Sequence, residues 1–415
     1  MEEPAAMPAR TVDGKPRSGQ LQIELLRLRQ ALAYRQSGRR DLRLDFLRGL
    51  AVSAMVVDHI GGDTPLTRLS GGNQAIVSAA EAFVFLSGLV LGIVYGGRIR
   101  RGGAEAALWG LVRRAATLYR ASVGMALAFI LIFLYTDLRM WHDRSEGLGV
   151  ADPVQAVVGA LTLHYSFHGS DVMVMYTIMM AVAPPIFYLM FKGQTRLVLL
   201  GSFVLWALFQ RYPQEASFPW NVQNSLFQVA PWQLLLVLGI ATGYHRNTVQ
   251  NFLLSGTQPA RAIVAVAAVG GFLLFWSEEA FRALPLPPAW FGNATYGSLF
   301  DKPGLGPGRV IAFLCFAILA YTIVNALWVP LNTLLGWLIL PLGQNSLYVY
   351  VAHGFVLVAI YNIIPIILMQ SAGAISPDNL NLGGQVLGLG VLYLMVRSRF
   401  LVSLLPQHGP HHTAD

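Results

Sequence analysis

Long apolar segments recur along this chain of 415 residues, and short polar or Pro/Gly-rich breaks separate them. A lipid bilayer requires about 20 consecutive apolar residues for each helical crossing, and its interior offers no partner to unpaired backbone groups. Hydrophobic residues make up 55% of the chain and charged residues only 12%, compared with about 25% charged residues in soluble domains. The sequence therefore predicts an all-α fold, a polytopic helical bundle that crosses a membrane.

The apolar segments predict ten transmembrane helices. They are expected near 46–61, 76–96, 112–135, 172–191, 197–210, 228–244, 262–280, 309–328, 345–368 and 384–403. Residues 329–343 are also apolar, but two prolines and two glycines interrupt them. For this segment we expect an interfacial helix on the cytoplasmic side rather than an eleventh crossing.

The formal net charge is +8, but the basic residues gather in particular loops and form no face with interleaved aromatic residues, which argues against nucleic acid as a partner. By the positive-inside rule, the basic loops belong to the cytoplasm, and an even number of crossings brings both termini there. We therefore divide the chain into a cytoplasmic basic tail (1–40), a transmembrane domain (41–404) and a cytoplasmic tail (405–415). Leucines at helical spacing over 20–36 fit a membrane-surface helix or an ordinary cytoplasmic helix equally well.

Arg48 and His59 lie eleven positions apart within the first predicted transmembrane helix. At about 100° per residue, eleven residues return to within about 20° of the same face, and the helical rise separates them by about 16 Å. Ionisable residues in a membrane are costly and usually functional. We therefore predict a substrate-binding role for Arg48 and a catalytic role for His59, since histidine changes its charge near neutral pH. The alternative for His59 is an ordinary buried histidine with its hydrogen bonds satisfied.

Two acidic residues accompany this pair. Asp45 precedes Arg48 by three residues, so it is a candidate for substrate binding, but helix capping or pairing with Arg48 would explain it equally. Asp58 is adjacent to His59 and points about 100° away from it in a helix. It is a catalytic candidate that would hold another element of the site, and the alternative is an interfacial residue at the helix end.

The second predicted transmembrane helix carries Glu81 near its outer end and Ser87 deeper. Glu81 belongs either at the outer water interface or beside His59, and an intramembrane carboxylate is by default a catalytic candidate. Ser87 is a substrate-binding candidate whose hydroxyl would otherwise bond within its own helix. Small residues at four-residue spacing follow (Gly88, Gly92 and Gly96), and they predict close packing against a neighbouring helix.

The spacing of Arg48 and His59 resembles the R-x10-H motif of the acyltransferase-3 type of transmembrane enzymes. Further blocks, in order over about residues 40–403, resemble the OpgC family, the osmoregulated periplasmic glucan succinyltransferases. These blocks are DLRLDFLRGL (41–50) with DHI (58–60), AAEAFVFLSG (79–88), DVMVMYT (171–177), PWQLLLVLG (231–239) and GQNSLYVY (343–350).

This resemblance implies transfer of a succinyl group from cytoplasmic succinyl-CoA to hydroxyls of periplasmic glucans, in a bacterial cytoplasmic membrane. Arg48 would bind a CoA phosphate or the succinyl carboxylate, and His59 would deprotonate the sugar hydroxyl, which attacks a thioester poorly without a base. Succinyl-CoA is then a co-substrate, and we expect no permanently bound cofactor and no metal. The lipid bilayer is the other partner, and a homo-oligomer remains open.

The oxyanion formed in such a reaction requires hydrogen-bond donors. Candidates near the ends of apolar segments are Gln233, Asn345, Ser346 and Tyr348, for which packing or capping is an equal explanation. Asp171 and Tyr176 are substrate-binding candidates because they lie in a block that resembles the family. Outer-loop histidines and tryptophans (His142, His164, His168, Trp141, Trp220 and Trp290) are weaker candidates for sugar binding, since tryptophan is common at membrane interfaces in general. The single cysteine, Cys315, lies in an apolar segment and is expected to serve packing.

Two other functions fit parts of this pattern. Related membrane enzymes O-acetylate other cell-envelope polysaccharides, and the acyl group is not encoded by Arg48 and His59 alone. A polytopic transporter would also explain the crossings and the buried polar groups, but it predicts internal repeats and discontinuous helices. We find no convincing repeat.

Overall fold

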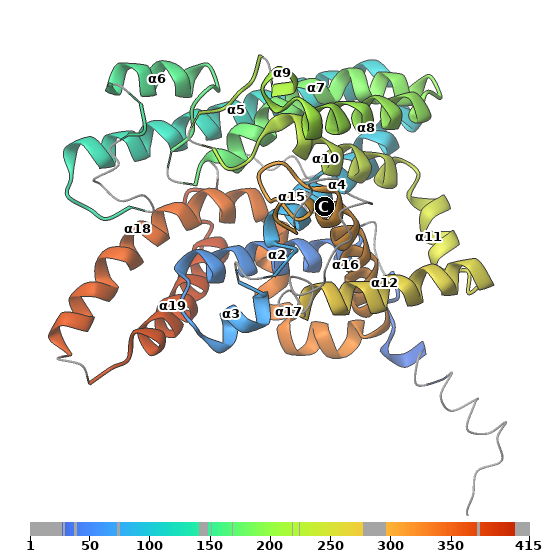
Figure 1. Ribbon diagram of the computed structural model, residues 1–415. Helices are drawn as coiled ribbons and strands as arrows, with labels where there is room; N and C mark the ends of the chain where they lie inside the picture. The colour runs from blue at the N-terminus through green and yellow to red at the C-terminus, as the bar shows by residue number, and fades with distance from the viewer. Residues whose placement is uncertain are drawn as a thin grey trace, which may run out of the picture.

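The computed structural model describes residues 27, 30–36, 40–72, 75–140, 148–150, 152–167, 169–217, 219–223, 225–276, 296–371 and 374–402. Over this part the chain is helical, apart from an isolated bridge between Tyr165 and Gln223, and the predicted all-α class is confirmed (Figure 1). The helices are α2 (Leu42–Ile60), α3 (Pro65–Ser70), α4 (Ala79–Gly102), α5 (Ala104–Tyr135), α6 (Pro153–Leu161), α7 (Asp171–Phe191), α8 (Thr195–Arg211), α9 (Pro213–Ser217), α10 (Val229–Tyr244), α11 (Arg246–Leu254), α12 (Gln258–Trp276), α15 (Tyr296–Leu299), α16 (Pro307–Ala326), α17 (Trp328–Gln344), α18 (Ser346–Gln370) and α19 (Pro377–Arg397).

Six helices in the described part of the chain are long and apolar enough to cross a membrane: α4, α5, α7, α16, α18 and α19. The bent pair α11 and α12 raises this number to seven if it forms one crossing. The other predicted crossings correspond to shorter or more charged helices: α8 has 17 residues, α10 has 16, and α2 carries four charged side chains. The chain is therefore a multi-pass membrane protein, and ten crossings remain a prediction.

Helix α2, which carries Arg48 and His59, lies in the middle of the bundle (Figure 1). It contacts α3, α4, α16, α17, α18 and α19. Asp41 caps its start by accepting a hydrogen bond from the backbone N–H of Arg43. Its end is set by Gly61, whose φ of +73° favours glycine. Because other helices surround α2, its charged residues face protein instead of lipid.

The glycines of α4 pack against α10, as their spacing predicts. A Cβ atom added to Gly88 would overlap the carbonyl of Leu236, and one added to Gly92 would overlap the carbonyl of Ile240. Gly239 of α10 meets the backbone of α4 in the same way. The two backbones are therefore in direct contact, which only small residues allow.

Helix α17 corresponds to the segment predicted to be interfacial. At its start, Trp328 meets Phe46 of α2 edge-on, and at its end Gly343 lies against the backbone of Asp45. Between these ends, Ile339 of α17 also meets Gly49, so α17 packs along the N-terminal half of α2, and its interfacial position stays a prediction. The prolines and glycines expected to interrupt this segment do not do so. Helix α17 is continuous through Gly336, Pro341 and Gly343.

Contacts between helix ends agree with an alternating path of the chain. At the predicted cytoplasmic end, Arg43 donates to Asn325, Arg100 to the carbonyl of Tyr244, and Tyr348 to the carbonyl of Phe400. At the opposite end, the backbone N–H of Asp63 donates to Asp378. Each of these four contacts joins two helix ends that the charge distribution predicts to lie on the same side of the membrane. The side of the membrane that each set faces remains a prediction.

Site-directed labelling tests this orientation. In a Cys315→Ala background, cysteine replacing Glu215 or Ala374 is expected to react with an impermeant maleimide in intact cells. Cysteine replacing Lys192 or Arg101 is expected to react only after permeabilisation. All four positions are exposed, so accessibility in the folded chain does not bias the comparison. Labelling of the second pair in intact cells would overturn the orientation.

Candidate active site

Helices α2 and α18 lie side by side, and polar contacts join them along their length. The Arg48 guanidinium donates through Nη2 to Ser346 Oγ at 2.5 Å, near the start of both helices. Near the other end, the Tyr361 hydroxyl donates to the His59 backbone carbonyl at 2.6 Å. The pair predicted from the sequence therefore lies against one neighbouring helix.

His59 contacts a second histidine that the sequence analysis missed. Its Nδ1 lies 3.2 Å from Nε2 of His353 on α18, and His353 is only 3% exposed. The other ring nitrogen of His353, Nδ1, faces the backbone carbonyl of Tyr350. A histidine inside an apolar helix is itself a sign of function, so the segment Val-Ala-His-Gly could have revealed it.

Asp45, for which pairing with Arg48 is one expected role, takes its side-chain hydrogen bonds from Arg40, while its charge also acts on Arg48. The Asp45 carboxylate accepts two hydrogen bonds from Arg40, at 2.5 and 2.8 Å. Arg40 precedes the helix and reaches back to the first turn, so it competes successfully for this carboxylate. Asp45 is also not the helix cap, since Asp41 has that role. Arg48 is thereby left to face α18 and the interior.

A second arginine accompanies Arg48. Arg114 of α5 is close enough to Arg48 for the two positive charges to interact, and Tyr176 of α7 is also within electrostatic range. Among the described residues, the buried Nε of Arg114 has no hydrogen-bond partner. The Asp45 carboxylate, held by Arg40, also acts on Arg48 by charge. Arg48 and Arg114 still bring two positive charges and an unused N–H donor to the same place, which favours binding of an anion. By sequence alone, Arg114 is one more basic residue of a loop assigned to the cytoplasm, and nothing marks it as a partner of Arg48.

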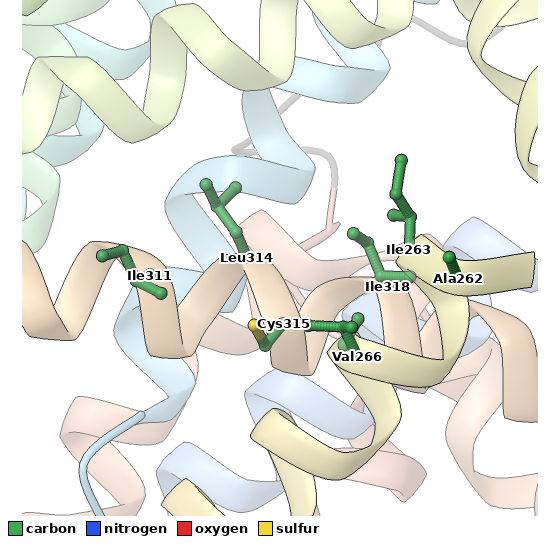
Figure 2. A pocket seen from close by; sticks show the side chains of 8 residues that line it. Ala262, Ile263, Val266, Ile311, Leu314, Cys315 and Ile318 are labelled. Carbon is green, nitrogen blue, oxygen red and sulfur yellow. The ribbon is translucent and has the colours of Figure 1, made fainter. Parts of the chain in front are cut away.

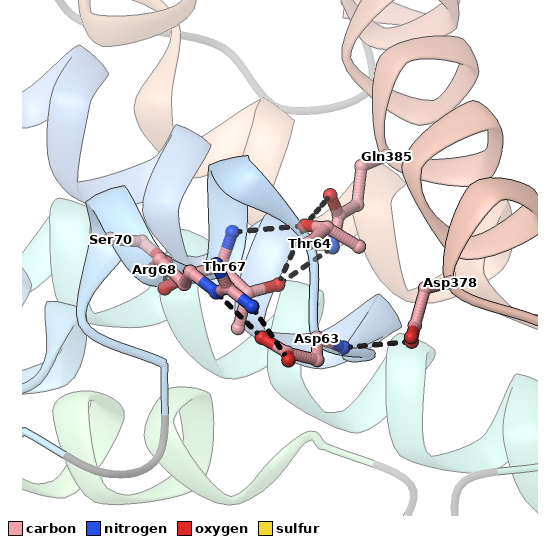
Figure 3. Close-up of polar contacts among 7 residues, drawn as sticks. All are labelled: Asp63, Thr64, Thr67, Arg68, Ser70, Asp378 and Gln385. Atoms are coloured by element: carbon pink, nitrogen blue, oxygen red, sulfur yellow. Dashed lines mark hydrogen bonds and ion pairs between the residues drawn. The ribbon is translucent and has the colours of Figure 1, made fainter.

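Asp58 holds a neighbouring element, which is one of the two predicted alternatives. Its carboxylate accepts a hydrogen bond from the Ser70 hydroxyl at the end of α3. Gln385 of α19 fixes the same loop, because its Nε2 donates to the Gly61 carbonyl at 2.9 Å. Its Oε1 also accepts a hydrogen bond from Thr64 at 2.7 Å (Figure 3). Asp58 therefore holds α3 against the C-terminal end of α2.

Glu81 has two structural partners. Its carboxylate pairs with Arg309 of α16, and it accepts hydrogen bonds from the backbone and hydroxyl of Ser78 in a capping box. The side chain is fully buried. No contact in the described part of the chain joins Glu81 to His59, and Ser87 is likewise buried on α4 without a contact to either residue of the pair. Glu81 thus braces α4 against α16.

Most of the other predicted site residues brace the helices. Gln233 exchanges hydrogen bonds with Ser202, at 2.7 and 2.8 Å, and so joins α10 to α8. Asn345 donates to the Pro341 carbonyl at 2.9 Å. Asp171 accepts from its neighbouring backbone N–H at the start of α7. Ser346 and Tyr348 are engaged by Arg48 and by the Phe400 carbonyl. None of these oxyanion candidates therefore has its hydrogen bonds directed to His59.

Two of the outer-loop candidates for sugar binding lie in the described part of the chain. His164 lies between the carbonyls of Thr162 and Pro219, and Trp220 is exposed. Trp141, His142, His168 and Trp290 lie outside the described residues. The described residues contain no group of three histidine, cysteine, aspartate or glutamate side chains arranged to hold a metal ion.

An apolar pocket of about 330 Å³ lies elsewhere, between α12 and α16. Cys315, Leu314 and Ile311 line it from α16, and Ile263 and Val266 from α12 (Figure 2). It contains none of the polar residues discussed above, so it is separate from the histidine pair. Cys315 packs there among aliphatic side chains, as predicted.

Comparison with known proteins identifies one relationship. A family model described as OpgC protein matches residues 40–402, which is nearly the whole described bundle. No curated protein and no solved structure matches the chain. The matched range includes Arg48, His59, Arg114 and His353.

Proposed function

The chain belongs to the OpgC family of membrane acyltransferases, and from this premise we propose that it transfers a succinyl group from succinyl-CoA to hydroxyls of osmoregulated periplasmic glucans. The proposed setting is a bacterial cytoplasmic membrane, with the donor on the cytoplasmic side and the acceptor on the periplasmic side. The observation that carries the proposal is the position of Arg48 and His59, which lie eleven residues apart on α2 and both contact α18. One helix then serves a donor on one side and an acceptor on the other.

The distance between the two residues supports a role for Arg48 in binding the phosphates of the donor. The two residues are about 16 Å apart along the helix axis, whereas the two ends of a succinyl group are only about 4 Å apart. The pantetheine arm of CoA has about 13 bonds between sulfur and phosphorus, and an extended chain gains about 1.2 Å per bond, so the arm spans roughly 15 Å. Arg48 and Arg114 therefore suit a CoA phosphate when the thioester is near His59.

In the proposed reaction, one proton moves from the glucan hydroxyl to His59 and then to the CoA thiolate. His59 accepts the proton of a glucan hydroxyl while the oxygen forms a bond to the thioester carbonyl carbon. The carbon–sulfur bond then breaks, and the CoA thiolate takes the proton from His59. The products are a succinyl ester and free CoA, and His59 returns to its starting state. Asp58 and Glu81 support this site by fixing α3 and α16, without transferring a proton.

Mass spectrometry of periplasmic glucans tests the proposal. Cells that express the protein are expected to add succinyl mass to their glucans, and cells without it are not. The matched control is cells that express the His59→Ala protein at the same level. This control separates catalysis from any effect of overproducing a membrane protein. A gain of acetyl mass would show that the transferred group is acetyl and not succinyl. Glucans of unchanged mass would contradict the proposal that glucans are the acceptor.

A further inference from the structure

The hydrogen-bond partners of His59 and His353 determine which ring nitrogen of each histidine carries a proton. A backbone carbonyl only accepts hydrogen bonds, so the Nδ1 of His353 that faces the Tyr350 carbonyl must carry a proton. A neutral imidazole carries one proton, and the Nε2 of His353 is then an acceptor. A cationic His353 would be costly here, because it is buried and no carboxylate among the described residues contacts it.

The protonation of His353 determines that of His59. Since Nε2 of His353 accepts, Nδ1 of His59 must donate across the 3.2 Å contact. A neutral His59 then has no proton on Nε2, which is the nitrogen able to accept one. The opposite arrangement would set the unprotonated Nδ1 of His353 against a carbonyl oxygen, and these two acceptors repel one another.

Helix α18 is held firmly enough to impose this arrangement. Tyr350, one turn before His353, donates to the Gly169 carbonyl at 2.6 Å and stacks on Phe83 of α4. A Cβ atom on Gly354 would lie 2.9 Å from Phe129 of α5, so α18 and α5 are closely packed beside His353. These contacts with α4, α5 and the Gly169 carbonyl hold α18 in place, and with it the Nε2 atom that His353 directs to His59.

We propose that His353 is a positioning residue: it holds His59 in the tautomer whose Nε2 accepts the proton, and it orients that ring. This inference rests on the proposed function, in which His59 is the general base. After proton transfer, His59 carries a positive charge, and its Nδ1–H continues to donate to His353. His353 thus stabilises the charged state without changing its own protonation.

Two substitutions separate this role from packing. Gln at position 353 retains an acceptor oxygen close to the position of Nε2, whereas Leu fills a similar space without an acceptor. For His353→Leu, we expect kcat to fall by about 10–100-fold, by analogy with the loss found when the hydrogen-bond partner of a metal-binding histidine is removed. The KM for succinyl-CoA is expected to stay unchanged, because the donor phosphates bind at the other end of α2. His353→Gln is expected to recover most of the loss.

The control and the double variant complete the test. His245→Leu removes another histidine that bridges two helices, through Thr195, and is expected to leave kcat unchanged. In a His59→Ala background, His353→Leu is expected to have no further effect, because the two residues act as a unit. Wild-type kcat in folded His353→Leu, or equal losses in the Leu and Gln variants, would overturn the positioning role. Full activity of His59→Ala would instead contradict the proposed function itself.

Discussion

Replacement of His59 by alanine is expected to lower kcat by about 10²–10⁴-fold, the usual contribution of a general base. A sugar hydroxyl is a weak acid, so without a base its oxygen attacks the thioester slowly. Binding of succinyl-CoA is expected to persist, since Arg48 and Arg114 remain in place. The measurement is release of the CoA thiol by purified protein with and without glucan.

Folding is controlled in the same preparation. His59 lies at the end of α2, where the Tyr361 hydroxyl binds its backbone carbonyl and Gln385 binds the next turn, so alanine keeps these main-chain contacts. The melting temperature is therefore expected to change little. Full turnover by a folded His59→Ala protein would exclude His59 from the chemistry.

Replacement of Arg48 by methionine is expected to weaken donor binding by about 2–5 kcal/mol, which corresponds to roughly 30–5000-fold in Kd. The reason is that a buried phosphate would lose a desolvated charge partner. Lysine is expected to restore only part of the affinity, because it lacks the planar group that binds an oxyanion at two points. Calorimetric titration of succinyl-CoA in detergent measures both variants.

The structure provides two controls for Arg48. Arg68→Gln removes an arginine that is exposed, paired with exposed Asp63 and distant from Arg48, and its effect on Kd is expected to be small. Ser346→Ala removes the contact of Arg48 with α18 but keeps its charge. If Arg48 only joined the helices, Ser346→Ala and Arg48→Met would lower the melting temperature alike and leave Kd unchanged. That result would remove Arg48 from the donor site.

The helices and their closest contact could be predicted because they depend on local patterns. Apolar segments between basic loops indicate membrane helices, and glycines at 88, 92 and 96 indicate a helix backbone that meets another. The stripe of Arg48 and His59 follows from the helical repeat alone. Each of these inferences requires only the residues within one segment.

Side-chain partners could not be predicted in this way, because distant segments supply them. Glu81 meets Arg309, and His59 meets His353, across more than 220 residues of sequence. Asp45 shows the same limit at short range, since two arginines are within reach and only the path of the chain before α2 favours Arg40. The helical face on which a residue lies is thus easier to predict than its partner.

Transfer across a sealed bilayer tests the central claim most directly. The protein is reconstituted into proteoliposomes with glucan enclosed and succinyl-CoA added outside, and the enclosed glucan is analysed for succinyl esters. We expect succinylated glucan inside and CoA thiol outside in equal amounts, with both lost in His59→Ala. CoA release without succinyl esters on the enclosed glucan would contradict transfer along α2, as would equal esterification by the His59→Ala protein.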